Sequence, residues 1–265
     1  MMEGFYLEVV ARLLAEGWLR SDDEVLVVAG GAADRDVLAT AGLESAVVTN
    51  LDEGMPSDVY APYRWSRQNA ENLTYGDRSF DVCIVHQGLH HCRSPHRALL
   101  EMYRVARRGL VLFEPQDTLL TRLGVRLGFG QRYEWAAVAD HDLHAGGVQN
   151  TNVPNFVYRW SAREVAKTLA SYDPTAPPRL RCFHDLRIPG AAAAATRSPV
   201  GRILAPIAVP AVRAVLTLFP GQANAIAVVV DKPDTHRDLH PWLVAGDAGP
   251  QVNTAWFARI GRTAR

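Results

Sequence analysis

Apolar runs alternate with amphipathic segments along the first 115 residues, and this pattern predicts strands that alternate with helices. Residues 25–29 and 80–85 are almost unbroken apolar runs, which suit central parallel strands covered on both faces. Residues 5–17 carry apolar side chains at helical spacing, and Ser94 followed by a proline is typical of a helix start. Such alternation predicts right-handed crossovers and a mostly parallel sheet.

Helix caps and short apolar runs complete the predicted fold, which is α/β. Asp34 is expected to cap a helix over 35–41, and Gly109 to end the helix that Ser94 begins. Ser161 is expected to begin a later helix, with Glu164 completing a capping box. We predict a Rossmann-like, doubly wound, seven-stranded and mostly parallel sheet with helices on both faces and an inserted cap region. The expected strands are 25–29, 46–51, 64–68, 80–85, 110–113, 180–188 and 225–230.

The chain has 265 residues, which is enough for one large domain with a well-filled core. We predict a single domain over 1–233 with a glycine-rich cap inserted near 115–158. A second insertion, rich in alanine and proline, is expected near 190–221. The tail over 234–265 is expected to pack on the domain or to be partly loose.

Charge and cysteine usage narrow the function classes. The 28 basic residues balance the 28 acidic ones, so nothing attracts the whole chain to nucleic acid or anionic lipid. No basic stripe interleaved with aromatics appears, and no apolar run reaches the length of a membrane span. The three scattered cysteines have no metal-ligand spacing, and no signal peptide is apparent, so a cytoplasmic location is expected.

The first predicted strand breaks into a glycine turn, Val-Leu-Val-Val-Ala-Gly-Gly-Ala-Ala-Asp over 25–34. A buried strand that opens into a helix through such a turn places backbone N–H groups against a nucleotide-like ligand. A glycine pair after an apolar strand is, by itself, equally well explained as a tight turn.

Four segments in order resemble the class I S-adenosylmethionine-dependent methyltransferases, in particular those that act on small molecules. They are the glycine turn, Val-Thr-Asn-Leu-Asp over 48–52, Asn-Ala-Glu-Asn-Leu over 69–73 with the strand after it, and Gly-Leu-His-His over 88–91 with its helix. The resemblance covers residues 20–115 by motif and extends to about 230 by strand order. It implies an enzyme of this fold with S-adenosylmethionine as its cofactor.

The resemblance also assigns roles to residues on these segments. Asp52, or Asn50 if the strand ends earlier, would accept hydrogen bonds from the ribose hydroxyls, and Asn69 would meet the adenine edge. The chain departs from the family where Val27 replaces an acidic residue and Ala29 and Ala33 replace glycines, so Asp34 or backbone carbonyls would hold the cofactor's ammonium group. The predicted cofactor-binding residues are Ala29, Gly30, Gly31, Asp34, Asn50, Asp52, Asn69, Ala70, His86 and Gln87.

Histidine is the natural base for a methyl transfer to oxygen, because it titrates near neutral pH. The candidates are His141 in the cap and the pair His90 and His91, one of which is expected to be a hydrogen-bonded turn residue. The cap histidines His141 and His144 lie among aspartates and could instead bind a metal, but their spacing matches no dedicated motif, and no metal is predicted.

Amides and aromatic residues gather in the cap, a composition that suits a polyol, a sugar or an amide-bearing substrate. We therefore predict methyl transfer to an oxygen or nitrogen of a small molecule, such as a natural product or a sugar-like acceptor. A non-catalytic cofactor-binding module and a nicotinamide-dependent oxidoreductase are the alternatives, although the glycine turn lacks the oxidoreductase fingerprint. The oligomeric state stays open, with a homodimer as one possibility. The predicted substrate-binding residues are Tyr133, Glu134, Asn152, Asn155 and Tyr158.

Overall fold

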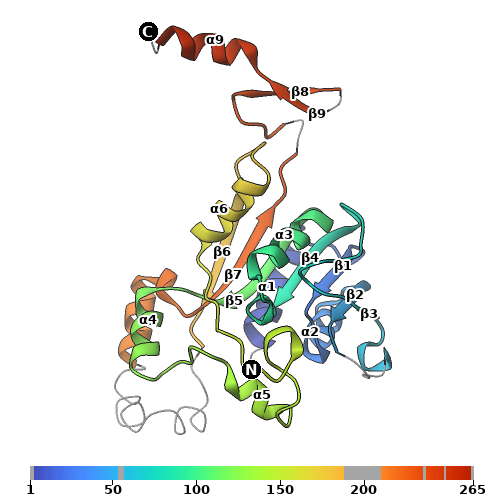
Figure 1. Cartoon of the computed structure of the whole chain (residues 1–265), viewed down its shortest axis with the longest axis vertical. Helices are drawn as coiled ribbons and strands as arrows, with labels where there is room; N and C mark the ends of the chain where they lie inside the picture. The colour runs from blue at the N-terminus through green and yellow to red at the C-terminus, as the bar shows by residue number, and fades with distance from the viewer. Residues whose placement is uncertain (1–2, 53–56, 188–209, 235–236, 248, 264–265) are drawn as a thin grey trace.

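The computed structural model describes residues 3–52, 57–187, 210–234, 237–247 and 249–263 of the chain. Its centre is a seven-stranded sheet with strand order β3-β2-β1-β4-β5-β7-β6 (Figure 1). All neighbouring pairs are parallel except those of β7, which runs antiparallel to β5 and β6. The predicted α/β fold class is confirmed. The strands are β1 (Glu24–Val28), β2 (Ser45–Asn50), β3 (Arg64–Arg67), β4 (Phe80–His86), β5 (Ala106–Pro115), β6 (Arg179–Asp185) and β7 (Ala225–Asp231).

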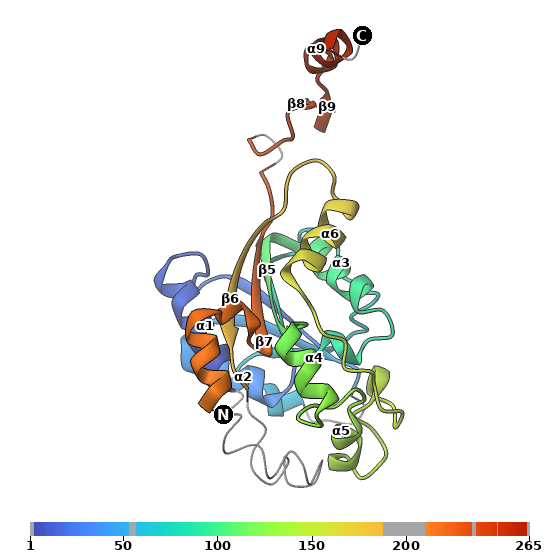
Figure 2. The same cartoon turned by 90° about the vertical axis from the view of Figure 1, so that its left-hand side faces the viewer.

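Helices cover both faces of the sheet, as predicted (Figure 2). Successive side chains of a strand point to opposite faces, so β1 contributes Leu26 and Val28 to one core and Val25 and Val27 to the other. The first core is covered by helices α3 (Pro95–Val105) and α6 (Ala162–Tyr172), and the second by α1 (Glu3–Ala15) and α2 (Ala32–Ala41).

Two of the predicted helix starts are confirmed by their caps. The hydroxyl of Ser94 accepts the N–H of Arg97 at 3.4 Å, and that of Ser161 accepts the N–H of Glu164 at 3.2 Å. The predicted capping box at Ser161 is half formed, because the Glu164 carboxylate instead accepts hydrogen bonds from Tyr158 and His96.

Two other local predictions were wrong. Helix α3 ends at Val105, and Gly109 lies inside β5, where an added Cβ would lie 2.2 Å from the Val230 carbonyl oxygen. Glycine is needed there for the close approach of β7 rather than for a helix end. Asp34 is the third residue of α2 and not its N-cap; its carboxylate accepts the N–H of the N-cap residue Gly31 at 2.8 Å.

The cap contains α4 (Leu119–Arg126), α5 (Trp135–Asp140) and the 3₁₀ turn η3 (Val148–Asn150). The η3 turn packs against η2 (Leu89–His91), which follows β4, so part of the cap lies at the carboxyl end of that strand. A further 3₁₀ turn, η1 (Ser57–Tyr60), follows β2.

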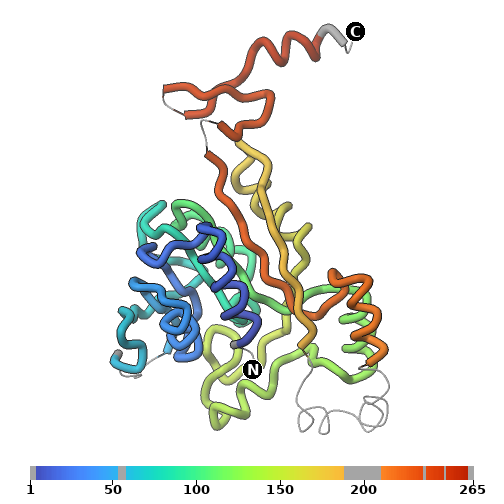
Figure 3. The backbone as a smooth tube through the Cα atoms, turned by 180° about the vertical axis from the view of Figure 1, so that it is seen from behind, coloured from blue at the N-terminus to red at the C-terminus, as the bar shows by residue number. Residues whose placement is uncertain are grey.

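The C-terminal segment lies beyond the other end of the sheet (Figure 3). The segment leaves β7 at Asp231, which pairs with Gly109 near the start of β5. It then forms a hairpin of β8 (Leu243–Gly246) and β9 (Gly249–Val252), followed by helix α9 (Thr254–Thr263). Arg179 and Asp238 form an ion pair between the sheet and this segment.

Most of the second predicted insertion, residues 190–209, lies outside the described residues. The rest forms a helix over 210–218 and the 3₁₀ turn η4 (Pro220–Gln222). Within the described ranges, no helix combines the length and the apolar character that a membrane span requires. All three cysteines are free thiols.

Candidate functional site

A cavity of about 310 Å³ lies at the carboxyl ends of β1, β2 and β4, beneath part of the cap. Ligands of open α/β sheets bind at this edge, where the strand order reverses. The cavity is lined by Ala29, Gly30 and Gly31 after β1, Asn50, Leu51 and Asp52 at β2, Gln68 to Glu71 after β3, Gln87, Gly88, His91 and Cys92 after β4, and Ala137, His141, Gly146, Gly147, Gln149 and Asn150 of the cap.

The glycine turn after β1 forms one wall of the cavity. Ala29 has a left-handed backbone with φ of 52°, a conformation that glycine would adopt without strain. A Cβ added at Gly88 would lie 2.7 Å from the Ala29 Cβ, whereas one added at Gly31 would meet nothing within 4 Å. Gly88 therefore permits the turns after β1 and β4 to touch, and Gly31 leaves open space on its exposed side.

Asp52 and Asn50, the two candidates for binding the ribose, differ in how many hydrogen bonds their side chains already make. The side-chain amide of Asn50 donates to the Gly30 carbonyl and the Tyr60 hydroxyl, both at 2.8 Å, and its oxygen accepts the indole N–H of Trp65 at 3.0 Å. Asn50 is therefore occupied in joining β1, β2 and β3. Asp52 is half-buried, and its Oδ1 accepts one hydrogen bond, from Asn150 of the cap at 2.7 Å. This geometry favours Asp52 over Asn50 for the ribose hydroxyls.

The segment after β3 forms the opposite wall of the cavity. Asn69 and Ala70, two of the predicted cofactor-binding residues, line this wall. The Asn69 Oδ1 accepts the N–H of Glu71 at 3.0 Å, which shapes the turn and leaves the amide nitrogen of Asn69 for a ligand. Glu71 also lines the cavity, and its Oε1 accepts the N–H of Arg93 at 2.7 Å and the amide of Gln149 at 3.3 Å.

Asp34 and His86 do not line the cavity. Val27, which stands where the family has an acidic residue, is fully buried in the core and supplies no charge. Asp34 lies buried behind the glycine turn, and burial raises its pKa to about 6. His86 stacks on Tyr6 with ring centroids 4.6 Å apart, and burial lowers its pKa to about 3, so it is a neutral core residue at pH 7. Its neighbour Gln87 does face the cavity.

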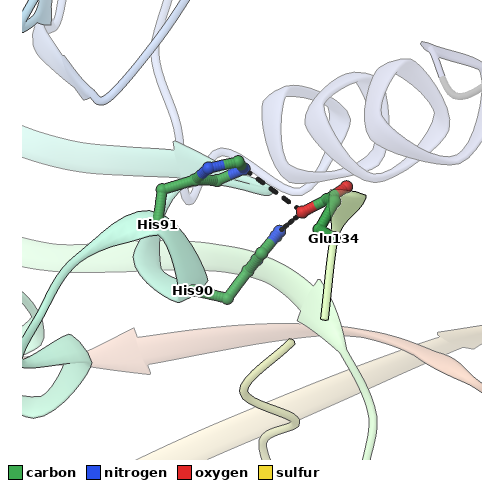
Figure 4. Close-up of side chains that lie close together, drawn as sticks. All are labelled: His90, His91 and Glu134. Atoms are coloured by element: carbon green, nitrogen blue, oxygen red, sulfur yellow. Dashed lines mark hydrogen bonds and ion pairs between the residues drawn. The ribbon is translucent and has the colours of Figure 1, made fainter. Parts of the chain in front are cut away.

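His90 and His91 follow β4, and both face the Glu134 carboxylate, which comes from the N-cap of α5 (Figure 4). The His90 Nε2 is 3.1 Å from Glu134 Oε2, and the His91 Nε2 is 3.5 Å from the same oxygen. The other ring nitrogen of His90, Nδ1, lies 2.7 Å from Oε2 of the fully buried Glu114 on β5.

The charges in this group depend on one another. Burial alone would lower the pKa of His90, but the Glu114 and Glu134 carboxylates outweigh burial and raise it to about 10. Burial would raise the pKa of Glu134, but hydrogen bonds and charge from His90 lower it to about 2. Burial and the positive His90 lower the pKa of His91. His90 is thus the hydrogen-bonded, charged turn residue, and His91 is a neutral imidazole at the cavity wall.

His141 lines the cavity from the cap, next to Ala137. Its Nδ1 lies 2.7 Å from the Ala137 carbonyl oxygen, an acceptor that keeps the proton of the neutral ring on Nδ1. The Nε2 atom is then the basic one. The neighbouring His144 is exposed and does not line the cavity.

None of the predicted substrate residues lines the cavity. The backbone N–H of Glu134 donates to the Asn155 carbonyl, and the buried Asn155 side chain donates to the His90 carbonyl at 3.1 Å, so both residues fix the cap to the turn after β4. Tyr158 packs against Trp160 and donates to Glu164. Tyr133 and Asn152 are exposed on the cap.

Several lining residues were not among the predicted ones. Gly146, Gly147, Gln149 and Asn150 belong to the glycine-containing amide loop of the cap, and their composition was the only signal for them in the sequence. Glu71 and Gly88 lie within the motifs that carry the resemblance, so the motifs themselves could have indicated them. Nothing in the sequence marks Cys92 or Ala137.

Comparison with known proteins agrees with the resemblance. Residues 28–113 match the family model described as a methyltransferase domain, within the segment that carries the motifs. The ubiquinone/menaquinone biosynthesis C-methyltransferase UbiE of Xanthomonas campestris pv. campestris is 34% identical over 108 residues, which are 36% of this chain and 43% of that protein. The UbiE protein of Xanthomonas axonopodis pv. citri is 33% identical over 108 residues, with the same coverage. The chain spans less than half the length of these curated relatives.

Solved structures share the fold at low identity. A candidate methyltransferase from Bacillus halodurans C-125 has a TM-score of 0.50 and 16% identity, covering 86% of this chain and 100% of that one. The YcgJ protein of Bacillus subtilis has a TM-score of 0.51 and 13% identity, covering 86% of this chain and 99% of that one. Both likenesses confirm the doubly wound sheet as the architecture of this chain.

Proposed function

Residues 28–113 belong to the methyltransferase domain family, and from this premise we propose that the chain transfers a methyl group from S-adenosylmethionine to an oxygen or nitrogen of a small molecule. The single observation that carries the proposal is the cavity, which brings the glycine turn, Asp52 and Asn69 together at the carboxyl edge of the sheet. These three elements are distant in sequence, and the resemblance assigns each of them to the same ligand.

The residues that line the cavity fit three parts of the cofactor: the ribose, the adenine and the amino-acid end. Asp52 would accept hydrogen bonds from the ribose hydroxyls, and Asn69 would meet the adenine edge. Gly31 has open space where a side chain would otherwise project, so the backbone can approach the amino-acid end. When bound, S-adenosylmethionine supplies a methyl group on a positively charged sulfur.

Two imidazoles, those of His141 and His91, line the cavity walls and are considered as the base. The His141 ring is held by a hydrogen bond at Nδ1, which leaves Nε2 free. We propose that Nε2 accepts the proton of the acceptor hydroxyl or amine. His91 also lines the cavity, but its Nε2 lies 3.5 Å from Glu134 Oε2, so it is not assigned this role. His90 does not serve as a base, because both of its ring nitrogens face carboxylates.

A carbon acceptor is the second candidate. The matched curated proteins are named as C-methyltransferases, and their likeness to this chain covers 108 residues, 36% of it. A non-catalytic cofactor-binding module is the remaining alternative, because Val27 and Ala29 depart from the family at the glycine turn.

Calorimetry on the purified full chain tests the cofactor, with S-adenosylhomocysteine and NAD as the two ligands. We expect S-adenosylhomocysteine to bind and NAD not to bind; the reverse result would contradict the proposal. Consumption of the methyl donor is then measured against a panel of small hydroxylated, amine-bearing and carbon-acid acceptors, with mass spectrometry for the gain of one methyl group. Binding without turnover on any acceptor would favour the non-catalytic module.

A further inference from the structure

We propose that His90, His91 and Glu134 form a binding site for one divalent transition-metal ion beside the cavity. Each of these residues offers one ligand atom, and all three atoms lie within 4.8 Å of one another. Two imidazoles and a carboxylate are a donor set that proteins use for zinc and for non-haem iron.

The spacing of the donor atoms suits a shared ion. Ligand atoms about 2.1 Å from one ion lie roughly 3.0 Å apart in an octahedral arrangement and roughly 3.4 Å apart in a tetrahedral one. Glu134 Oε2 lies 3.1 Å from His90 Nε2 and 3.5 Å from His91 Nε2. An ion could therefore bridge these donors with small shifts of the side chains.

The outer contacts of the ligands match those of metal sites. A metal-binding histidine usually donates its other ring N–H to a carboxylate or carbonyl, which fixes the ring and makes it more basic. His90 does this with Glu114, whose second oxygen accepts the N–H of Leu89 at 2.8 Å. Asn155 donates to Glu134 Oε2 at 3.3 Å, so two of the three ligands are held from outside.

The burial of the three side chains leaves one side of the site open. The His90 side chain is 2% exposed, whereas those of His91 and Glu134 are 28% and 32% exposed. Because His91 also lines the cavity, an ion held here would have coordination positions that a molecule in the cavity can reach. Imidazole donors favour zinc, copper, iron or nickel over magnesium, calcium and manganese, which prefer oxygen ligands.

The ion would take the place of the proton between His90 and Glu134, so metal binding releases a proton. Its role at the acceptor rests on the function proposed above. The ion would polarise an acceptor hydroxyl, whose proton would pass to His141; the acceptor oxygen would then bond to the methyl carbon, while the electron pair of the broken sulfur–carbon bond would stay on sulfur. The acceptor class is therefore a small molecule with adjacent oxygen atoms that can chelate a metal.

The test measures metal binding alone, on the full chain without a histidine tag and without cofactor or acceptor. Zn²⁺ and Co²⁺ are titrated by calorimetry, and the Co²⁺ complex is followed by its visible absorption. We expect about one equivalent to bind. The Glu134→Gln variant should lose more affinity than the roughly 10–100-fold that removal of an outer partner costs, and Glu114→Gln should lose that smaller amount.

Glu164→Gln is the matched control, because Glu164 also pairs with a histidine, His96, at 3.1 Å but belongs to no group of three donors among the described residues. It should bind metal as the wild type does. If Glu134→Gln fails to fold by circular dichroism, His91→Asn carries the test instead. Absence of stoichiometric binding in the wild type, or unchanged affinity in a folded ligand variant, would overturn the proposal. Neither result depends on S-adenosylhomocysteine binding, so failure of this proposal and failure of the proposed function are distinguishable.

Discussion

The side-chain amide of Asn150 donates to Asp52 Oδ1 at 2.7 Å, which joins the cap to the end of β2 across 98 residues of sequence. Its neighbour Gln149 donates to Glu71 at 3.3 Å, and both cap residues have left-handed backbones, with φ of 49° and 57°. The cap is thus tied to the same carboxylate that the resemblance assigns to the ribose. Ligand entry must replace the Asn150 hydrogen bond at Asp52 or share it.

Replacing Asp52 by alanine should weaken the binding of S-adenosylhomocysteine by about 1–3 kcal/mol, because the ribose hydroxyls would lose their acceptor. Calorimetry at fixed salt measures this change. Asp22→Ala, which removes an exposed carboxylate far from the cavity lining, should leave the affinity unchanged. Equal affinities for wild type and Asp52→Ala would remove Asp52 from the ribose role.

Two of the glycines that line the cavity, Gly31 and Gly88, should respond differently to replacement by alanine. Gly31→Ala adds a Cβ that meets nothing within 4 Å, so stability should change by less than about 1 kcal/mol while the added methyl group weakens S-adenosylhomocysteine binding. Gly88→Ala forces a Cβ to within 2.7 Å of the Ala29 Cβ and should cost about 1–3 kcal/mol of stability. Urea unfolding and calorimetry on both variants separate the two effects. Unchanged ligand affinity in Gly31→Ala would place the cofactor elsewhere.

His141→Ala should slow turnover by about 10²–10⁴-fold, the usual contribution of a general base, while cofactor affinity stays nearly unchanged. Steady-state methyl-donor consumption on the identified acceptor and calorimetry give the two quantities. His144→Ala is the control, because this exposed residue belongs to the same loop but does not line the cavity. A full rate in His141→Ala would exclude His141 as the base.

Asp34 should make the protein less stable as the pH rises from about 4 to about 6. Its carboxyl has a pKa of about 6 when folded, because of burial, against an ordinary value of 3.8, so the native state binds more protons in this range. The resulting loss of unfolding free energy is complete above about pH 6 and amounts to about 3 kcal/mol.

The comparison that isolates this effect is the difference in unfolding free energy between wild type and Asp34→Asn, measured in urea at pH 4.5 and pH 7. The wild type should lose stability relative to the variant as the pH rises. The contributions of the other titrating groups to the unfolding free energy are the same in both proteins and cancel in the difference. Asp36→Asn, in the same helix but with an exposed side chain, is the control variant. A pH-independent difference for Asp34→Asn would contradict the burial effect.

The alternation of apolar runs and capped helices was enough to predict the sheet, since burial on both faces and right-handed crossovers leave few arrangements for such a chain. Ser94 and Ser161 marked helix starts correctly, because a cap acts on the N–H groups of its own first turn. The prediction for Gly109 was wrong, because glycine is needed there for the close approach of the Val230 carbonyl. That carbonyl lies on another strand, and the local sequence does not reveal it.

The sequence by itself determined the fold class, the order of the motifs and the residues of the glycine turn, all of which depend on neighbours along the chain. Tertiary structure alone decided that Asp52 meets Asn150, that His90 is charged between Glu114 and Glu134, and that Tyr158 belongs to another cluster. These contacts join segments far apart in sequence, and their energies depend on distance and burial, which exist only once the chain has folded.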